Sequence, residues 1–234
     1  PKDYKTDVFH PDESGNLTAI MDEKLYSNIK LFCEKHQVTP YMFLMSAFAF
    51  LINKFTRKSN IIIGTPVANR PFKELEGVIG NFVNTLPIVY DIDLNSSVYD
   101  YINEAKDEIL LSLTNQNLPF SEIVKAIAPE RTYEDNPLTN IMFVMENMPK
   151  STLSLNDLKI NASEINAKQA KFDMTMFISE ENDILNINFE YKKNLWHVET
   201  ISSLIHSYKK ILCEFIKSPE KALSDISICL LYTS

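Results

Sequence analysis

The sequence has few glycines, few cysteines and fewer basic than acidic residues, and each shortage argues against a class of protein. Lys and Arg together number 23 against 31 Asp and Glu, for a formal net charge of −8, whereas nucleic-acid binding needs a cationic surface that displaces counterions. The three cysteines are far apart in the chain, which argues against a zinc motif and favours a reduced, cytoplasmic setting. The most hydrophobic stretch, Tyr41–Ile52, is about half of the ~20 residues that a membrane span requires.

Several catalytic and metal-binding patterns are also missing from the sequence. It contains no GxSxG nucleophile elbow, no Walker loop and no GxGxxG turn, so a hydrolase of that kind and nucleotide binding by those loops are not predicted. The four histidines are His10, His36, His197 and His206. Nine positions turn a helix by about 900°, so His197 and His206 would face opposite sides of the helix expected there. No metal site is predicted.

Glycine is scarce but clustered, and the cluster marks the most informative part of the chain. Three of the four glycines, Gly64, Gly77 and Gly80, fall between two apolar runs, Ile61–Ile63 and Thr85–Tyr90. The runs predict buried strands. The glycines indicate that the loop backbone either bends sharply or lies close to another group.

Apolar periodicity and capping residues predict the other elements of a mixed α/β fold (an α+β sandwich) in which helices pack on the sheet. No internal domain boundary is evident, so residues 1–234 are expected to form a single domain. Residues 1–16 are expected to be an irregular lead-in, and no element is expected before about Asp22. Helices are predicted at 22–36, 40–55, 98–114, 119–128 and 197–217, a strand at 141–145, and a β-hairpin from the runs 172–179 and 184–191.

Five segments, in a fixed order, resemble the condensation domains of nonribosomal peptide synthetases. The first is VANR followed by IGNFVNTLP, over residues 67–87; NQNLPF at 115–120 resembles a second motif of that family. The others are residues 131–143, with Pro137-Leu138 and Met142-Phe143, then KFDMT at 171–175 and LSDI at 223–226. The segment FVNT, residues 82–85, resembles the corresponding segment of peptide-bond-forming members more than that of epimerisation domains.

The resemblance implies a lobe of the chloramphenicol-acetyltransferase-like fold. In that family two lobes enclose a tunnel, into which the phosphopantetheine arms of donor and acceptor peptidyl carrier proteins deliver thioester substrates. The family's catalytic HHxxxDG motif is absent, so the chain is expected to be a C-terminal lobe that is inactive alone, with its catalytic lobe upstream. No catalytic residue and no directly bound cofactor are predicted. The expected partners are the N-terminal lobe and carrier proteins, with self-association of the isolated lobe near residues 64–90.

The same resemblance suggests which polar residues line the tunnel or the bridging loop. They are Gly64, Thr65, Asn69, Arg70, Gly80, Asn84 and Thr85. Arg70 could equally fix its loop by bonding carbonyls, and Asn84 and Thr85 could be capping groups. Asp173 interrupts an apolar stretch, so it should have a cationic or hydrogen-bonding partner, for which Arg131 and Arg70 are candidates. A structural role for Asp173 and Arg131 is favoured over catalysis.

Two other functions remain open from the sequence. The chain could belong to a stand-alone acyltransferase of the same superfamily, which uses coenzyme A or a carrier-bound acyl group. It could also be a non-catalytic module that docks carrier proteins. The sequence upstream in the parent gene discriminates between these hypotheses, because an HHxxxDG motif beside adenylation and carrier domains would indicate condensation.

Overall fold

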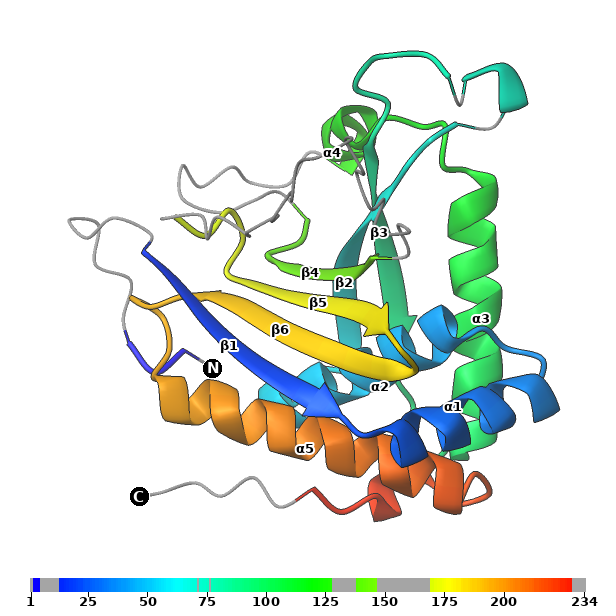
Figure 1. Cartoon of the computed structure of the whole chain (residues 1–234), viewed down its shortest axis with the longest axis vertical. Coiled ribbons are helices and arrows are strands. Elements are labelled where there is room, and N and C mark those ends of the chain that lie inside the picture. The colour runs from blue at the N-terminus through cyan, green and yellow to red at the C-terminus, as the bar shows by residue number, and fades with distance from the viewer. Residues whose placement is uncertain are drawn as a thin grey trace, which may run out of the picture.

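The fold is a six-stranded mixed sheet with helices packed against it, as the apolar pattern predicts. A computed structural model describes residues 2–4, 13–70, 72–75, 77–127, 138–146 and 169–228. The strands lie in the order β1-β6-β5-β4-β2-β3, and α1, α2 and α5 lie together beside the sheet (Figure 1). The elements are β1 (Ser14–Met21), α1 (Glu23–Lys35), α2 (Pro40–Thr56), β2 (Asn60–Val67), a 3₁₀ turn (Lys73–Leu75), β3 (Asn84–Asp91), α3 (Val98–Thr114), α4 (Phe120–Ile127), β4 (Ile141–Glu146), β5 (Met174–Glu181), β6 (Ile184–Lys192), α5 (Val198–Lys217) and a second 3₁₀ turn (Leu223–Asp225).

Local signals explain where the helices begin. The side chains of Asp22, Thr39 and Ser97 each accept a hydrogen bond from a backbone N–H in the first turn of the helix that follows. These bonds satisfy donors that a helix leaves unpaired at its N-terminus. The predicted boundaries of α1, α2 and α3 are confirmed to within one or two residues.

Helix α2 forms the centre of the core. Every residue from Met42 to Asn53 is buried, because α3 and α5 pack against the helix and β2 lies beside it. Its continuous apolar sequence therefore has a structural reason, and the methionines and phenylalanines are core side chains. In the part of the chain that the structure describes, no single helix is long and apolar enough to cross a membrane; α1 and α2 meet that criterion only as a pair bent by 106°.

The predicted β5–β6 hairpin is confirmed. Glu181 pairs with Ile184, so Asn182 and Asp183 form a two-residue turn, and both have a positive φ (52° and 61°). Asn and Asp tolerate this left-handed conformation, which a type I′ turn requires at both positions.

The expected irregular lead-in is wrong for its last residues, because strand β1 begins at Ser14 and pairs along its length with β6. Gly15 and Asn16 are residue types that strands disfavour, which hid the strand in the sequence. In the fold Gly15 allows a close approach, since a Cβ there would overlap the ring of Tyr191.

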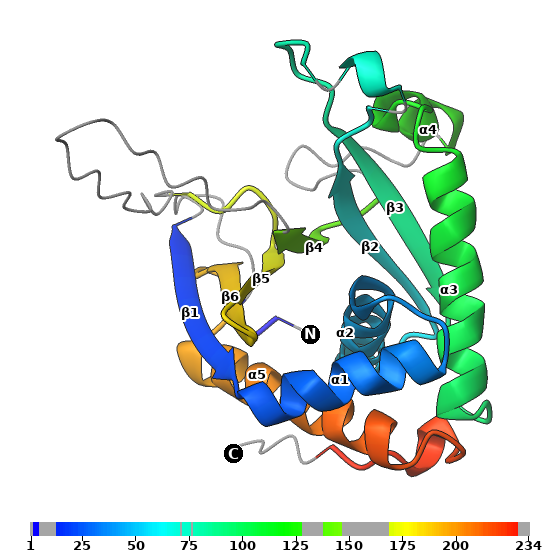
Figure 2. The same ribbon diagram turned by 45° about the vertical axis from the view of Figure 1, so that its right-hand side comes forward.

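The sheet divides between β2 and β4. Gly64 and Met142 are the one residue pair recorded between these parallel strands, whereas each of the other neighbouring strands pairs over six or more residues. The β2–β3 hairpin consequently diverges from the other four strands and carries its loop away from the rest of the sheet (Figure 2).

Candidate functional site

The fold brings the predicted site residues to one end of the β2–β3 hairpin. Val67 pairs with Asn84 and Pro66 with Thr85 at the last positions of the ladder, and Asn69, Arg70 and Gly80 follow in the loop beyond them. This loop, residues 68–83 apart from 71 and 76, projects at the top of Figure 2. These predicted site residues therefore lie close together, whereas their assignment to a tunnel stays a prediction.

Gly64 and Thr65 lie where β2 meets its neighbours. A Cβ on Gly64 would overlap Met142 Sδ and come within 2.9 Å of Thr139 Cγ2, so the glycine permits the contact between β2 and β4. Thr65 is 2% exposed and accepts a 2.9 Å hydrogen bond from the Tyr41 hydroxyl of α2. The prediction of close backbone approach is confirmed at Gly64. The chain also bends at the two loop glycines, since Gly77 lies in a turn and Gly80 in a bend, although no described glycine has a positive φ.

Arg70 holds the loop together from within. Its Nη1 donates to the carbonyl oxygens of Leu75 and Val78, the latter at 2.9 Å, and its Nη2 to that of Gly80 at 3.5 Å. The guanidinium also lies over the ring of Phe82, 4.4 Å from its centre, where a cation–π attraction adds to the bonds. Arg70 therefore fixes its loop by bonding carbonyls, which is one of the two roles that the sequence left open for it.

Asn84 joins β3 to the segment that enters α4. Its Nδ2 donates to the carbonyl oxygens of Gln116 (2.9 Å) and Leu118 (2.8 Å), and its Oδ1 accepts from the Phe120 N–H (3.0 Å). The last bond satisfies one of the backbone donors exposed at the start of α4. Thr85 is half-buried beside Pro66. Asn84 is thus a capping and bracing residue, whatever further role the tunnel prediction gives it.

Among the predicted site residues that the structure describes, Asn69 alone has a buried side-chain atom without a hydrogen-bond partner. Its φ of 49° is left-handed, a conformation that asparagine tolerates better than most residues. Its Oδ1 is buried and has no hydrogen-bond partner among the described residues. An acceptor in that state carries a desolvation cost of about 1–3 kcal/mol, which a donor from another group would remove.

The projecting loop is apolar as well as polar. Phe72, Val78 and Val83 are 44–66% exposed and Ile79 is fully exposed. Large apolar side chains gathered on a projecting segment are typical of an interaction surface.

Asp173 pairs with two lysines that were not among its expected partners. Asp173 is 6% exposed, and its two carboxylate oxygens lie 3.2 Å from Lys2 Nζ and 3.4 Å from Lys192 Nζ. Arg70 is instead committed to loop carbonyls, and Arg131 lies outside the described residues. The expectation that the buried carboxylate has a cationic or hydrogen-bonding partner is confirmed, but the lysines come from the N-terminal segment and the end of β6.

Two of the described histidines, His36 and His197, have structural contacts. His197 stands at the N-cap position of α5, where its side chain makes no capping bond. Its ring shares a 2.6 Å hydrogen bond with the Tyr4 hydroxyl, and its backbone N–H donates to Asp3. His36 packs against the rings of Phe32 and Tyr99. Burial lowers the pKa of His36, with a smaller contribution from Lys35. No cluster of three or more potential metal ligands occurs in the described ranges.

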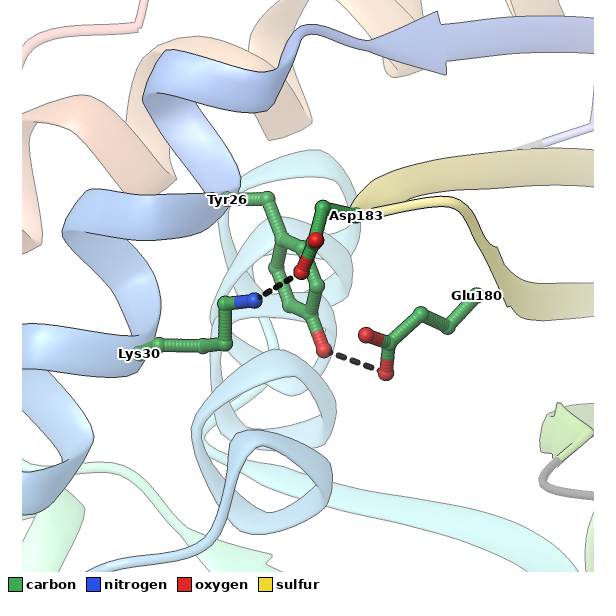
Figure 3. Close-up of polar contacts among 4 residues, drawn as sticks. All are labelled: Tyr26, Lys30, Glu180 and Asp183. Atoms are coloured by element: carbon green, nitrogen blue, oxygen red, sulfur yellow. Dashed lines mark hydrogen bonds and ion pairs between the residues drawn. The ribbon is translucent and has the colours of Figure 1, made fainter.

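A polar cluster on the opposite side of the core escaped the sequence analysis. The Tyr26 hydroxyl donates to Glu180 at 2.6 Å, and the Lys30 ammonium pairs with Asp183 at 2.5 Å while lying over the Tyr26 ring (Figure 3). Burial and the Glu180 carboxylate raise the pKa of Tyr26 above its ordinary value. The cluster ties α1 to the β5–β6 turn, and no local signal predicts it because its halves are more than 150 residues apart.

Comparison with known proteins decides the family. The family model described as "Condensation domain" matches residues 1–230. The chain belongs to the condensation domain family. It is 29% identical over 228 residues to bacitracin synthase 1 of Bacillus licheniformis, and 32% identical over 190 residues to tyrocidine synthase 3 of Brevibacillus parabrevis. These alignments cover 97% and 81% of the chain but only 4% and 3% of the relatives.

Solved structures establish the fold of this condensation-family chain. A four-domain nonribosomal peptide synthetase bound to AMP and glycine matches 97% of the chain with a TM-score of 0.91 at 23% identity, over 18% of its own length. The X-domain from teicoplanin biosynthesis matches 97% of the chain with a TM-score of 0.88 at 16% identity, over 52% of its length. The mixed sheet and its helices therefore have the chloramphenicol-acetyltransferase-like fold that the sequence resemblance implies.

Proposed function

We propose that this chain is the C-terminal lobe of a condensation domain that forms peptide bonds in nonribosomal peptide synthesis. The observation that carries the proposal is coverage: nearly all of the chain matches about half of an isolated domain of the same fold. The order of the family-like segments, which ends with LSDI at residues 223–226, supports the C-terminal half.

In this function the lobe supplies one wall of the tunnel, and the projecting loop of residues 68–83 contacts the N-terminal lobe. The exposed side chains of Phe72, Val78, Ile79 and Val83 suit burial in such an interface. Phosphopantetheine arms of donor and acceptor carrier proteins bring in the two thioesters, and the acceptor amine attacks the donor carbonyl. Holding the two reactants in register provides much of the rate by raising their effective concentration.

The upstream lobe provides the test. The isolated chain, mixed with acyl-loaded and aminoacyl-loaded carrier proteins, should give no dipeptide above the rate in buffer. Adding the upstream lobe should restore dipeptide formation, and the same lobe with its second signature histidine replaced should not. Turnover by this chain alone that disappears when one of its own histidines is replaced would contradict the half-domain proposal.

A non-catalytic docking module is the second candidate, because the X-domain of the same fold forms a complex with OxyB. The reconstitution separates the candidates. A docking module would bind its partner protein tightly and still give no dipeptide with any upstream lobe.

A further inference from the structure

Among the described strands, β3 has a partner on one side alone, which is β2. The Ile92 N–H donates to the carbonyl of Ser59, the residue opposite it, at 3.0 Å. Because the pairing of β2 with β3 continues without a break, every second residue of β3 from Ile92 directs its backbone groups toward β2. Tyr90 therefore directs its backbone N–H and C=O toward β2, whereas Val89 and Asp91 direct theirs outward. Pro87 falls on the same outward set, where its missing N–H costs the hairpin nothing. β3 is the end of the sheet.

A groove runs along this unpaired edge. It is an open depression of about 440 Å³ between β3 and α3, two elements that lie side by side in both ribbon views (Figures 1 and 2). Val89, one of the lining residues, is 47% exposed, so apolar surface lies next to its outward backbone groups. The lining residues are Val89, Tyr90 and Asp91 of β3, with Tyr101, Glu104, Ala105, Asp107 and Glu108 of α3.

The charge of the groove is of one sign. Asp91 and the three acidic residues of α3 contribute carboxylates, and none of the described residues that line the groove is basic. In the part of the chain that the structure describes, none of the four forms an ion pair. Glu104 and Glu108 are also one helical turn apart, a spacing at which like charges destabilise a helix by about 0.2–0.5 kcal/mol. Cationic groups in the groove would relieve this repulsion.

We propose that the open edge of β3 binds an extended, basic segment of a partner protein, which adds to the sheet as a further strand. The outward backbone groups of Val89 and Asp91 would pair with the segment, as in β-strand addition generally, and its lysines or arginines would meet the four carboxylates. A second copy of this chain is disfavoured because it carries the same carboxylates and a net charge of −8. The proposal is independent of peptide-bond formation, and the site is distinct from the projecting loop at the other end of the hairpin.

Two labelled octapeptides of equal charge test the proposal. One alternates lysine with valine, and the other has the same sequence with every backbone nitrogen methylated, which removes all of the N–H donors that a strand would supply. We expect the unmethylated lysine–valine peptide to bind at least tenfold more tightly in fluorescence anisotropy and to slow hydrogen exchange of the Val89 and Asp91 amides. Equal affinities would show that only charge is recognised and would overturn strand addition. Slow exchange of both amides in a dimer without peptide would identify a second copy as the occupant and would overturn it as well.

Variants of the chain separate the two parts of the interaction. Val89→Pro removes an outward N–H and leaves the ladder to β2 intact, so it should weaken binding of the unmethylated lysine–valine peptide at least tenfold, whereas Val89→Ala should change it less than threefold. The triple variant Glu104→Gln, Asp107→Asn, Glu108→Gln should weaken it at least tenfold. A matched triple, Glu34→Gln, Glu74→Gln, Glu199→Gln, places the same charge change elsewhere and should stay within threefold. If Val89→Pro does not fold, the acidic triple and the amide exchange of the unmodified chain decide, and unchanged affinity in the acidic triple overturns the proposal.

Discussion

A 3.0 Å hydrogen bond joins the Phe120 N–H to Asn84 Oδ1, so the first turn of α4 is held by a side chain that lies 36 positions earlier in the chain. The same amide donates to two carbonyls of the connection that precedes the helix. Asn84 therefore uses all but one of the hydrogen bonds available to an asparagine side chain. The position of α4 relative to the hairpin depends on this residue.

Replacing Asn84 should accordingly destabilise the chain. Asn84→Ala removes three hydrogen bonds and leaves two carbonyl oxygens and one N–H without this partner. We expect a loss of about 1–3 kcal/mol in the free energy of unfolding. Asn84→Asp keeps the acceptor but sets a carboxylate against two carbonyl oxygens, so it should not rescue. Urea denaturation measures both. Asn103→Ala is the matched control, because that exposed amide bonds only its own helix and should shift stability by less than about 0.5 kcal/mol.

The contacts of Arg70 lead to a prediction about loop order. Arg70→Lys keeps the charge but cannot reproduce a planar fork that reaches three carbonyls. Both Arg70→Lys and Arg70→Ala should accelerate hydrogen exchange and proteolysis in residues 72–80, while Lys73→Ala, an exposed neighbour in the same loop, should not.

In a restored two-lobe domain the same variants distinguish the two roles left open for Arg70. If the residue acts only as a strut, catalytic rate should fall together with loop order. A rate that falls on the order of 100-fold while the loop keeps its protection would instead place Arg70 in contact with substrate.

Substitution by alanine should have opposite effects on stability at Gly64 and Gly77. Gly64→Ala would drive a methyl group into Met142 and Thr139, and overpacking of this kind costs about 1–3 kcal/mol. Gly77→Ala meets nothing within 4 Å and its φ is not left-handed, so it should be neutral or stabilise by up to about 1 kcal/mol. Thermal and urea unfolding of the two variants measure the difference. Equal effects would contradict the close approach of β2 and β4.

Tyr26 should make stability depend on alkaline pH. Its pKa is raised in the folded chain, by burial first and then by Glu180, while an unfolded tyrosine titrates near 10. Its contribution is therefore fully present below about pH 10 and is lost as the pH rises toward the folded pKa, at about 1.4 kcal/mol per pH unit for one proton.

Tyr26→Phe tests this linkage. It should lower the free energy of unfolding by about 1 kcal/mol at pH 8 through the lost hydrogen bond, and the gap to the unmodified chain should close above pH 10. Glu180→Gln keeps an acceptor for the hydroxyl, so it should stay within about 0.5 kcal/mol at pH 8. A gap for Tyr26→Phe that is constant from pH 8 to 11 would contradict the raised pKa.

Interactions between near neighbours in the chain could be predicted from the sequence. Asp22, Thr39 and Ser97 cap helices by bonding residues three positions ahead, and Asn182-Asp183 closes a hairpin within four residues. Such signals depend on chain positions that any conformation keeps close together, which is why the helix boundaries and the hairpin agree with expectation. The family-like segments also located the loop in which the candidate site lies.

What the tertiary structure decided is the choice among partners that are distant in the chain. The sequence required a cationic or hydrogen-bonding partner for Asp173, but only the fold selected Lys2 and Lys192 over Arg70. Strand β1 exists because β6 pairs with it, not because Gly15 and Asn16 favour a strand. The same holds for Tyr26 with Glu180 and for the open edge of β3: local propensity is set by each residue's immediate neighbours, whereas pairing across the fold is set by the packing of the whole core.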